Sequence, residues 1–141
     1  MEDQKLHLEV ASKLENLPEV RDFIADAMKS LGFGSEKEIF EVQVAVDEAC
    51  TNIMKHAYPG TAGPIIIDCS GSGNEFKIII RDKGKSFDPK SVPEPDTKAP
   101  LEKRKIGGLG IFLMKAYIDK LDYTFDADAG NELTMIKYIG K

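Results

Sequence analysis

The sequence predicts an α+β fold, a two-layer sandwich in which three helices cover one face of a mixed or mostly antiparallel sheet of about five strands. Apolar residues alternate with polar ones in some stretches and recur at helical spacing in others, and these two periods distinguish strands from helices. The 141 residues show no repeat and no boundary, and this length is typical of one domain. We therefore expect residues 1–141 to form a single domain.

The chain is expected to open with a strand over residues 6–10. Leu6, Leu8 and Val10 alternate there with His7 and Glu9, which is the pattern of a half-buried strand. His7 is then expected to face outward and to have a structural role.

Two helices are predicted next. Apolar residues recur at helical spacing over residues 17–31, with a proline near the start and glycines just past the end, as is usual at helix termini. Ser35 and Glu38 form a capping box, which opens a second helix with an apolar stripe from Ile39 to Ala57.

Glu48 and Asn52 are four residues apart on this second helix, so their side chains point in similar directions. At about 100° per residue, both turn away from the main apolar stripe. Taken alone, such a pair is more commonly a solvated polar face than a functional site.

Two antiparallel strands are predicted over residues 64–69 and 75–81, joined by a turn rich in Gly, Ser and Asn. The second strand leads into Asp82-Lys83-Gly84. An acid followed by glycine is also common in ordinary turns, so this signal is weak by itself.

Residues 89–105 contain four of the seven prolines and few large apolar residues, so we expect a long loop that acts as a lid or binding loop. Glycine-rich residues 107–110 then open a helix with apolar residues from Phe112 to Leu121, and its bare N–H groups suit phosphate. Strands over 123–127 and 133–139 are expected to close the fold as a hairpin through Ala129-Gly130-Asn131.

Charge and cysteine content exclude some functions. The net charge of −5 argues against sequence-independent binding to nucleic acid, although Lys103-Arg104-Lys105 forms a local basic cluster that an ordinary solvated charge run explains equally well. Cys50 and Cys69 lack metal-type spacing, so neither zinc nor a disulfide is predicted. With no apolar leader or membrane-length segment, a cytoplasmic protein without membrane contact is expected.

Three motifs occur in the order found in the ATPase superfamily shared by gyrase, Hsp90, histidine kinases and MutL, and the chain resembles that superfamily from about residue 38 onward. They are Glu48-x-x-x-Asn52 with His56-Ala57-Tyr58, Asp82-x-Gly84-x-x-Phe87-Asp88, and Gly107-Gly108-Leu109-Gly110-Ile111. Small size, the glutamate before the asparagine and the His-Ala-Tyr continuation resemble the anti-sigma factor serine kinases of the RsbW type. Such proteins bind a sigma factor and phosphorylate a serine of an anti-anti-sigma partner.

The resemblance implies ATP and Mg²⁺ as cofactors and a homodimer. Asn52 would coordinate Mg²⁺, which prefers oxygen ligands, and Asp82 would accept a hydrogen bond from the adenine amino group. Glu48 would be the base that takes the serine proton, and Lys105 or Arg104 could neutralise charge on the γ-phosphoryl group. The remaining implied nucleotide contacts are His56, which could equally be a simple helix-end histidine, and Gly84, Phe87, Gly107, Gly108, Leu109, Gly110 and Ile111.

One feature departs from the family. A Gly-Thr-Thr-type run commonly supplies a hydroxyl near adenine, whereas this chain reads Gly130-Asn131-Glu132-Leu133-Thr134. Thr134 or a water replaces that hydroxyl, or the contact is missing.

Two other function classes remain open. One is the catalytic domain of a histidine kinase, although His7 and His56 are the only histidines and no upstream dimerisation helices are seen. The other is a non-catalytic, ATP-dependent protein-binding module in which Glu48 is idle.

Overall fold

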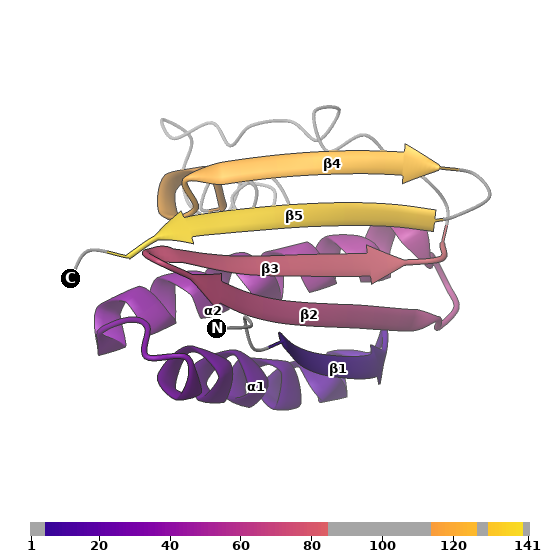
Figure 1. Ribbon diagram of the computed structural model, residues 1–141. Helices are drawn as coiled ribbons and strands as arrows, with labels where there is room; N and C mark the ends of the chain where they lie inside the picture. The colour runs from indigo at the N-terminus through magenta and orange to yellow at the C-terminus, as the bar shows by residue number, and fades with distance from the viewer. Residues whose placement is uncertain (1–4, 85–113, 127–129, 140–141) are drawn as a thin grey trace, which may run out of the picture.

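The computed structural model describes residues 5–84, 114–126 and 130–139 and shows a sheet with its helices on one side (Figure 1). The strands are β1 (Lys5–Ala11), β2 (Pro64–Ser72), β3 (Glu75–Asp82), β4 (Lys120–Asp126) and β5 (Gly130–Tyr138). Their order across the sheet is β1-β2-β3-β5-β4, and each neighbouring pair is antiparallel. The predicted α+β sandwich is confirmed, with a sheet that is antiparallel throughout its described strands.

The first two helices form where the sequence indicates. A 3-10 turn, η1 (Leu14–Asn16), leads into α1 (Leu17–Ser30), and α2 spans Glu36–Asn52. The capping box is present, because the Ser35 hydroxyl accepts from the Glu38 backbone N–H while the Glu38 carboxylate accepts from the Ser35 backbone N–H. Both orphan donors at the start of α2 are thereby satisfied.

The core lies between the helices and the inward face of the sheet. One inward row crosses three strands in register: Ile67, Ile80 and Leu133, which are 0%, 1% and 6% exposed. Burying each such side chain contributes roughly 1.5 to 3 kcal/mol. From the helices, Val42 and Val46 of α2 and Ile24 of α1 are buried in the same core. The next inward pair, at the end of β3 and the start of β5, is polar: Asp82 lies opposite Asn131, and the candidate site lies there.

The last predicted helix extends too far. Residues 114–117 are helical, but Leu121 belongs to β4, where it pairs with Met135 of β5. The backbone N–H of Asp119 donates to the Ile136 carbonyl at 3.0 Å, and its carboxylate accepts from the Tyr138 backbone N–H at 2.7 Å. Pairing with β5 therefore overrides the helical spacing. In the same way Gly130 and Asn131 belong to β5, whereas the sequence suggested a connecting turn.

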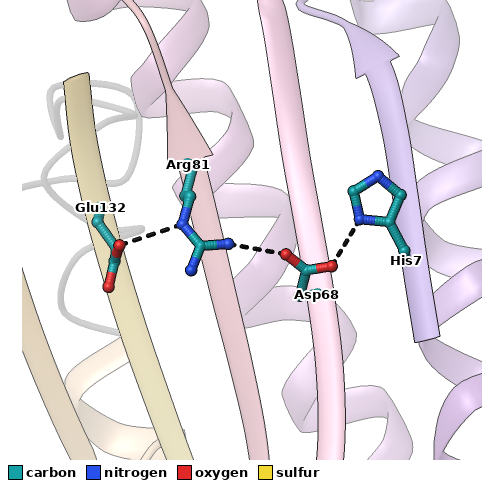
Figure 2. Close-up of polar contacts among 4 residues, drawn as sticks. All are labelled: His7, Asp68, Arg81 and Glu132. Carbon is teal, nitrogen blue, oxygen red and sulfur yellow. Dashed lines mark hydrogen bonds and ion pairs between the residues drawn. The ribbon is translucent and has the colours of Figure 1, made fainter. Parts of the chain in front are cut away.

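The other face of the sheet carries a chain of interacting polar side chains across β1, β2, β3 and β5 (Figure 2). Asp68 accepts from His7 at 2.6 Å and from Arg81 at 2.8 Å, and Arg81 also reaches Glu132 at 3.1 Å. His7 thus faces outward as expected. These groups are partly exposed, and such pairs contribute about 0 to 1 kcal/mol each.

Candidate functional site

A pocket lies where the end of α2 meets the end of β3 and the start of β5. Its walls combine apolar residues with polar residues that come from α2, β3 and β5. The lining residues are Ala49, Asn52, Ile53, Ile80, Asp82, Tyr123, Asn131, Glu132 and Leu133. Predominantly apolar walls with a few converging polar groups are typical of small-molecule sites.

Asp82 is the acidic group of the pocket. It is the last residue of β3 and is 3% exposed. Its Oδ1 accepts from the Gly84 backbone N–H and from Asn131 Nδ2, each at 2.9 Å. Burial raises the pKa of the Asp82 carboxyl, while the hydrogen bonds from Asn131 and Gly84 lower that pKa. The two donors therefore stabilise a buried carboxylate that would otherwise be more readily protonated.

The chain just after β3 is held against the end of the helix. The Tyr58 hydroxyl accepts from the Lys83 backbone N–H at 2.7 Å and donates to the Pro64 carbonyl at 2.9 Å. At Gly84, a Cβ atom would lie 2.4 Å from the Ala57 carbonyl oxygen, closer than atoms can approach, so glycine permits this contact. The glycine of the motif thus has a packing reason in this fold.

Asn52 lies inside the pocket, which corrects the expectation that it turns away from the core. Asn52 is 2% exposed, because the pocket lies next to the apolar stripe of α2 and the strand residues that line it cover this side of the helix. Its Oδ1 is buried and accepts no hydrogen bond within the described part of the chain. Since buried polar atoms are nearly always paired, this oxygen is suited to a ligand.

Glu48 lies one turn before Asn52 on α2 and is half-buried, outside the pocket lining. Its Oε2 is also buried and lacks a hydrogen-bond partner among the described residues. Burial raises the pKa of the Glu48 carboxyl, the charge of Lys55 opposes that shift, and the charge of Asp47 adds to it. Asp47 itself is paired with Arg21 of α1 at 2.7 Å.

A π-helical turn, η2 (Ile53–Ala57), follows Asn52 directly, and the Tyr58 backbone N–H donates to the Ile53 carbonyl at 3.0 Å. Such wide turns inside helices are frequent at functional sites. The regular apolar spacing gave no signal for it. His56 lies in η2, outside the pocket lining.

The structure brings some of the predicted site residues together at the pocket and places Thr134 on the opposite face of the sheet. Asn52 and Asp82 share the pocket, and Gly84 donates to Asp82. Thr134 pairs with Ile79 and Asp122 on the face away from the helices, so it is not brought to Asp82. Phe87, Arg104, Lys105, Gly107, Gly108, Leu109, Gly110, Ile111 and the expected lid over 89–105 lie outside the described residues.

Sequence reasoning missed Asn131 and Tyr123. Both lie on the inward face, because Asn131 pairs with Asp82 and Tyr123 pairs with Leu133. Alternation backward from Leu133 would have placed Asn131 on that face. It was instead assigned to a turn.

The described residues hold no cluster of metal-ligating side chains and no membrane-spanning helix. No group of three or more His, Cys, Asp or Glu side chains among them could hold a metal ion, so a cation here would need ligand oxygens in addition to Asn52. No helix in that part of the chain is both long and apolar enough to cross a membrane.

Comparison with known proteins identifies the family. Residues 10–137 match the histidine kinase-like ATPase domain. The chain is 31% identical to the serine-protein kinase RsbW of Bacillus thuringiensis strain Al Hakam, over 96% of this chain and 86% of that protein. It is 31% identical, with the same coverage, to serine-protein kinase RsbW of Bacillus anthracis.

A solved structure shares the fold. The crystal structure of the RsbU and RsbW domains of Rv1364c from Mycobacterium tuberculosis superposes with a TM-score of 0.69 at 15% identity, covering 98% of this chain. This chain spans 33% of that longer one. The chain belongs to the family of histidine kinase-like ATPase domains and, within it, to the serine-protein kinases of the RsbW type.

Proposed function

We propose that this protein is an ATP-dependent serine kinase that acts as an anti-sigma factor, sequestering a sigma factor and phosphorylating a serine of an anti-anti-sigma partner. Family membership supports the kinase activity. The observation that carries the site assignment is the pair of buried oxygens, Asn52 Oδ1 and Glu48 Oε2, which lack hydrogen-bond partners within the described residues. One turn of α2 separates these two groups.

The residues present fit a nucleotide with its metal ion. Asn52 presents a neutral amide oxygen, which is a ligand that Mg²⁺ accepts alongside phosphate oxygens and water. Mg²⁺ bound there would neutralise negative charge on the phosphates. Asn52 would therefore position the phosphate chain at the end of α2.

The inner part of the pocket suits adenine. Ile53, Ile80 and Leu133 provide apolar surface for a flat ring, and the buried Asp82 carboxylate can accept a hydrogen bond from its amino group. A carboxylate at this depth discriminates against a base that presents a carbonyl oxygen instead, because two acceptors would then face each other.

Glu48 is proposed as the general base. The serine oxygen forms a bond to the γ-phosphorus as the bond to the ADP oxygen breaks, and the serine proton passes to Glu48. Burial raises the pKa of the Glu48 carboxyl above its ordinary value, and a higher pKa makes the carboxylate a stronger proton acceptor. Positioning of the serine hydroxyl against the γ-phosphate contributes the rest of the rate acceleration.

We also propose a domain organisation, a cellular location, an oligomeric state and further nucleotide contacts. The chain would act as one ATP-binding domain over residues 1–141, with a lid over 89–105, in the cytoplasm and as a homodimer. Asn131 replaces Thr134 in the proposed adenine site, because only Asn131 lies on the inward face. The other proposed nucleotide contacts are His56, Gly84, Phe87, Lys105, Gly107, Gly108, Leu109, Gly110 and Ile111.

The test is single-turnover transfer of the γ-phosphate of labelled ATP to a serine-bearing anti-anti-sigma protein. Glu48→Gln should bind ATP almost normally while transfer falls by about 10² to 10⁴-fold, the usual contribution of a general base. Glu36→Gln is the matched control, since Glu36 is an exposed carboxylate at the start of the same helix. Its transfer rate should be unchanged.

The same experiment addresses the other two function classes. Label on the partner that survives acid is phosphoserine, whereas acid-labile label on a histidine would indicate a histidine-kinase-like catalytic domain. ATP binding without transfer in the wild-type protein would identify a non-catalytic, ATP-dependent binding module. A wild-type rate in Glu48→Gln would remove Glu48 from the mechanism.

A further inference from the structure

Asn131 is a buried polar residue of the pocket for which the sequence motifs predict no role. It is 5% exposed and sits directly opposite Asp82 in the register of β3 and β5. Its Nδ2 donates to Asp82 Oδ1 at 2.9 Å and also lies 3.4 Å from the Gly84 carbonyl oxygen. One amide group thus contacts both the acid and the glycine of the Asp82-Lys83-Gly84 turn.

The backbone just before Asn131 approaches the backbone of Asp82 closely. Gly130, just before Asn131, has φ +96°, and a Cβ atom there would lie 2.3 Å from the Asp82 carbonyl oxygen. Only glycine tolerates both the positive φ and this approach. The start of β5 therefore packs directly against the backbone of Asp82 at the end of β3.

The donors on Asp82 are unevenly distributed. Asn131 Nδ2 and the Gly84 N–H both reach Oδ1, and no donor from the described parts of the chain reaches Oδ2. Two donors on one oxygen fix the plane of the carboxylate and leave the second oxygen as the acceptor for a ligand. We propose that Asn131 is a positioning residue that orients the Asp82 carboxylate and thereby sets the preference of this site for a purine with a 6-amino group.

This inference rests on the proposed nucleotide site and deepens it, because it names the residue that controls base selectivity. The electrostatics of Asp82 agree with a role for Asn131 in holding its carboxylate. Burial raises the pKa of Asp82 and the Asn131 hydrogen bond opposes that rise, so loss of the amide should make the carboxyl easier to protonate. Gly84 is the other neighbour that lowers this pKa, and it remains in the variants below.

The experiment measures dissociation constants for ATP and for inosine triphosphate, which carries a carbonyl in place of the amino group. Asn131→Ala should weaken ATP about tenfold, the scale of one hydrogen bond to a charged group, and should weaken inosine triphosphate much less. Asn131→Leu has a similar size, lacks the donor and adds no charge beside Asp82, so it tests the same loss if the alanine variant does not fold. Thr134→Val, on the opposite face of β5, is the control and should change neither constant.

Two further measurements distinguish positioning from a merely structural role. In an Asp82→Asn background, Asn131→Ala should no longer alter the ratio of the two dissociation constants, because its effect acts through the carboxylate. Carbon-13 NMR of the Asp82 carboxyl, in protein without nucleotide, should show a higher titration midpoint in Asn131→Ala than in the wild type.

The outcomes separate the inference from the proposed function. Equal loss of both nucleotides with an unchanged Asp82 midpoint would overturn the positioning role while leaving nucleotide binding intact. If the wild type binds neither nucleotide, the proposed function fails and the selectivity claim fails with it. A shifted midpoint together with a reduced preference for ATP is the result expected.

Discussion

Replacing Asn52 with leucine should make the ligand-free protein more stable and should abolish its response to Mg²⁺ and ATP. Asn52 Oδ1 is buried without a partner in the described residues, and the side chain is 2% exposed. Leucine has a similar size and would contact Ala49, Ile53 and Ile80, which line the same pocket. The substitution removes an unpaired acceptor from an apolar setting.

The magnitude follows from two opposing contributions. An unpaired buried acceptor costs roughly 1 to 3 kcal/mol, and a change of shape in a packed site costs up to about 1.5 kcal/mol. We expect a net gain of about 1 kcal/mol in the free energy of unfolding, which raises the Tm of a chain this long by about 3 °C. In the wild type, ATP at a hundred times its dissociation constant should add about 2.7 kcal/mol, which the variant loses.

Thermal unfolding is the assay, in chelator without nucleotide and then with Mg²⁺ and ATP. The order of stability should reverse between the two conditions, with Asn52→Leu the more stable form only in chelator. Asn16→Leu is the control. Asn16 Nδ2 donates to the Ala11 carbonyl at 2.9 Å, so the same substitution should there destabilise the protein in both conditions.

Two results would refute the reasoning separately. A loss of 1 kcal/mol or more in the ligand-free state would show that Asn52 Oδ1 is satisfied in the native protein. A full stabilisation of Asn52→Leu by Mg²⁺ and ATP would remove Asn52 from the metal site, whatever its effect on stability.

Three other perturbations test the fold and the electrostatics. Burial raises the pKa of Glu48 above its ordinary value of 4.5. The protonated Glu48 carboxyl therefore contributes fully to the free energy of unfolding below pH 4.5, and this contribution is lost as pH rises through the pKa of the folded protein. The stability of Glu48→Gln relative to the wild type, measured by unfolding in urea, should therefore grow from pH 4.5 to 7. Gly130→Ala should lower the free energy of unfolding by about 2 kcal/mol or more, because Gly130 has φ +96° and an added Cβ atom would meet the Asp82 carbonyl. Gly73→Ala is the control and should lower it by about 1 kcal/mol, because Gly73 has φ +61° but nothing lies within 4 Å of the added Cβ. Equal losses in the two variants would contradict the argument from this contact. Arg81→Met breaks the ion pairs to Asp68 and Glu132, but its side chain is 41% exposed, so chemical denaturation should show a loss below about 1 kcal/mol, and a larger loss would mean that the pairs act as a network.

Local patterns in the sequence were sufficient for most elements and for part of the site. Alternation in β1, helical spacing in α1 and the Ser35–Glu38 capping box concern residues within a few positions of each other, and each formed as predicted. The acid that ends β3 was also recognised, because a strand followed by Asp and Gly is a local signal. Such features depend on the backbone period and on nearby hydrogen bonds.

The tertiary structure decided which of these residues share a pocket. Asn52 was expected to turn outward and is buried, because the end of β3 and the start of β5 pack beside the apolar stripe of α2. Leu121 continues the apolar spacing of a helix yet pairs with Met135 in β4, because strand pairing with β5 satisfies its backbone. The choice between Asn131 and Thr134 depends on register, since a shift of one residue exchanges the two faces of a strand. Register is a relation between β3 and β5, which lie 49 residues apart where Asp82 meets Asn131, so no local pattern could settle it.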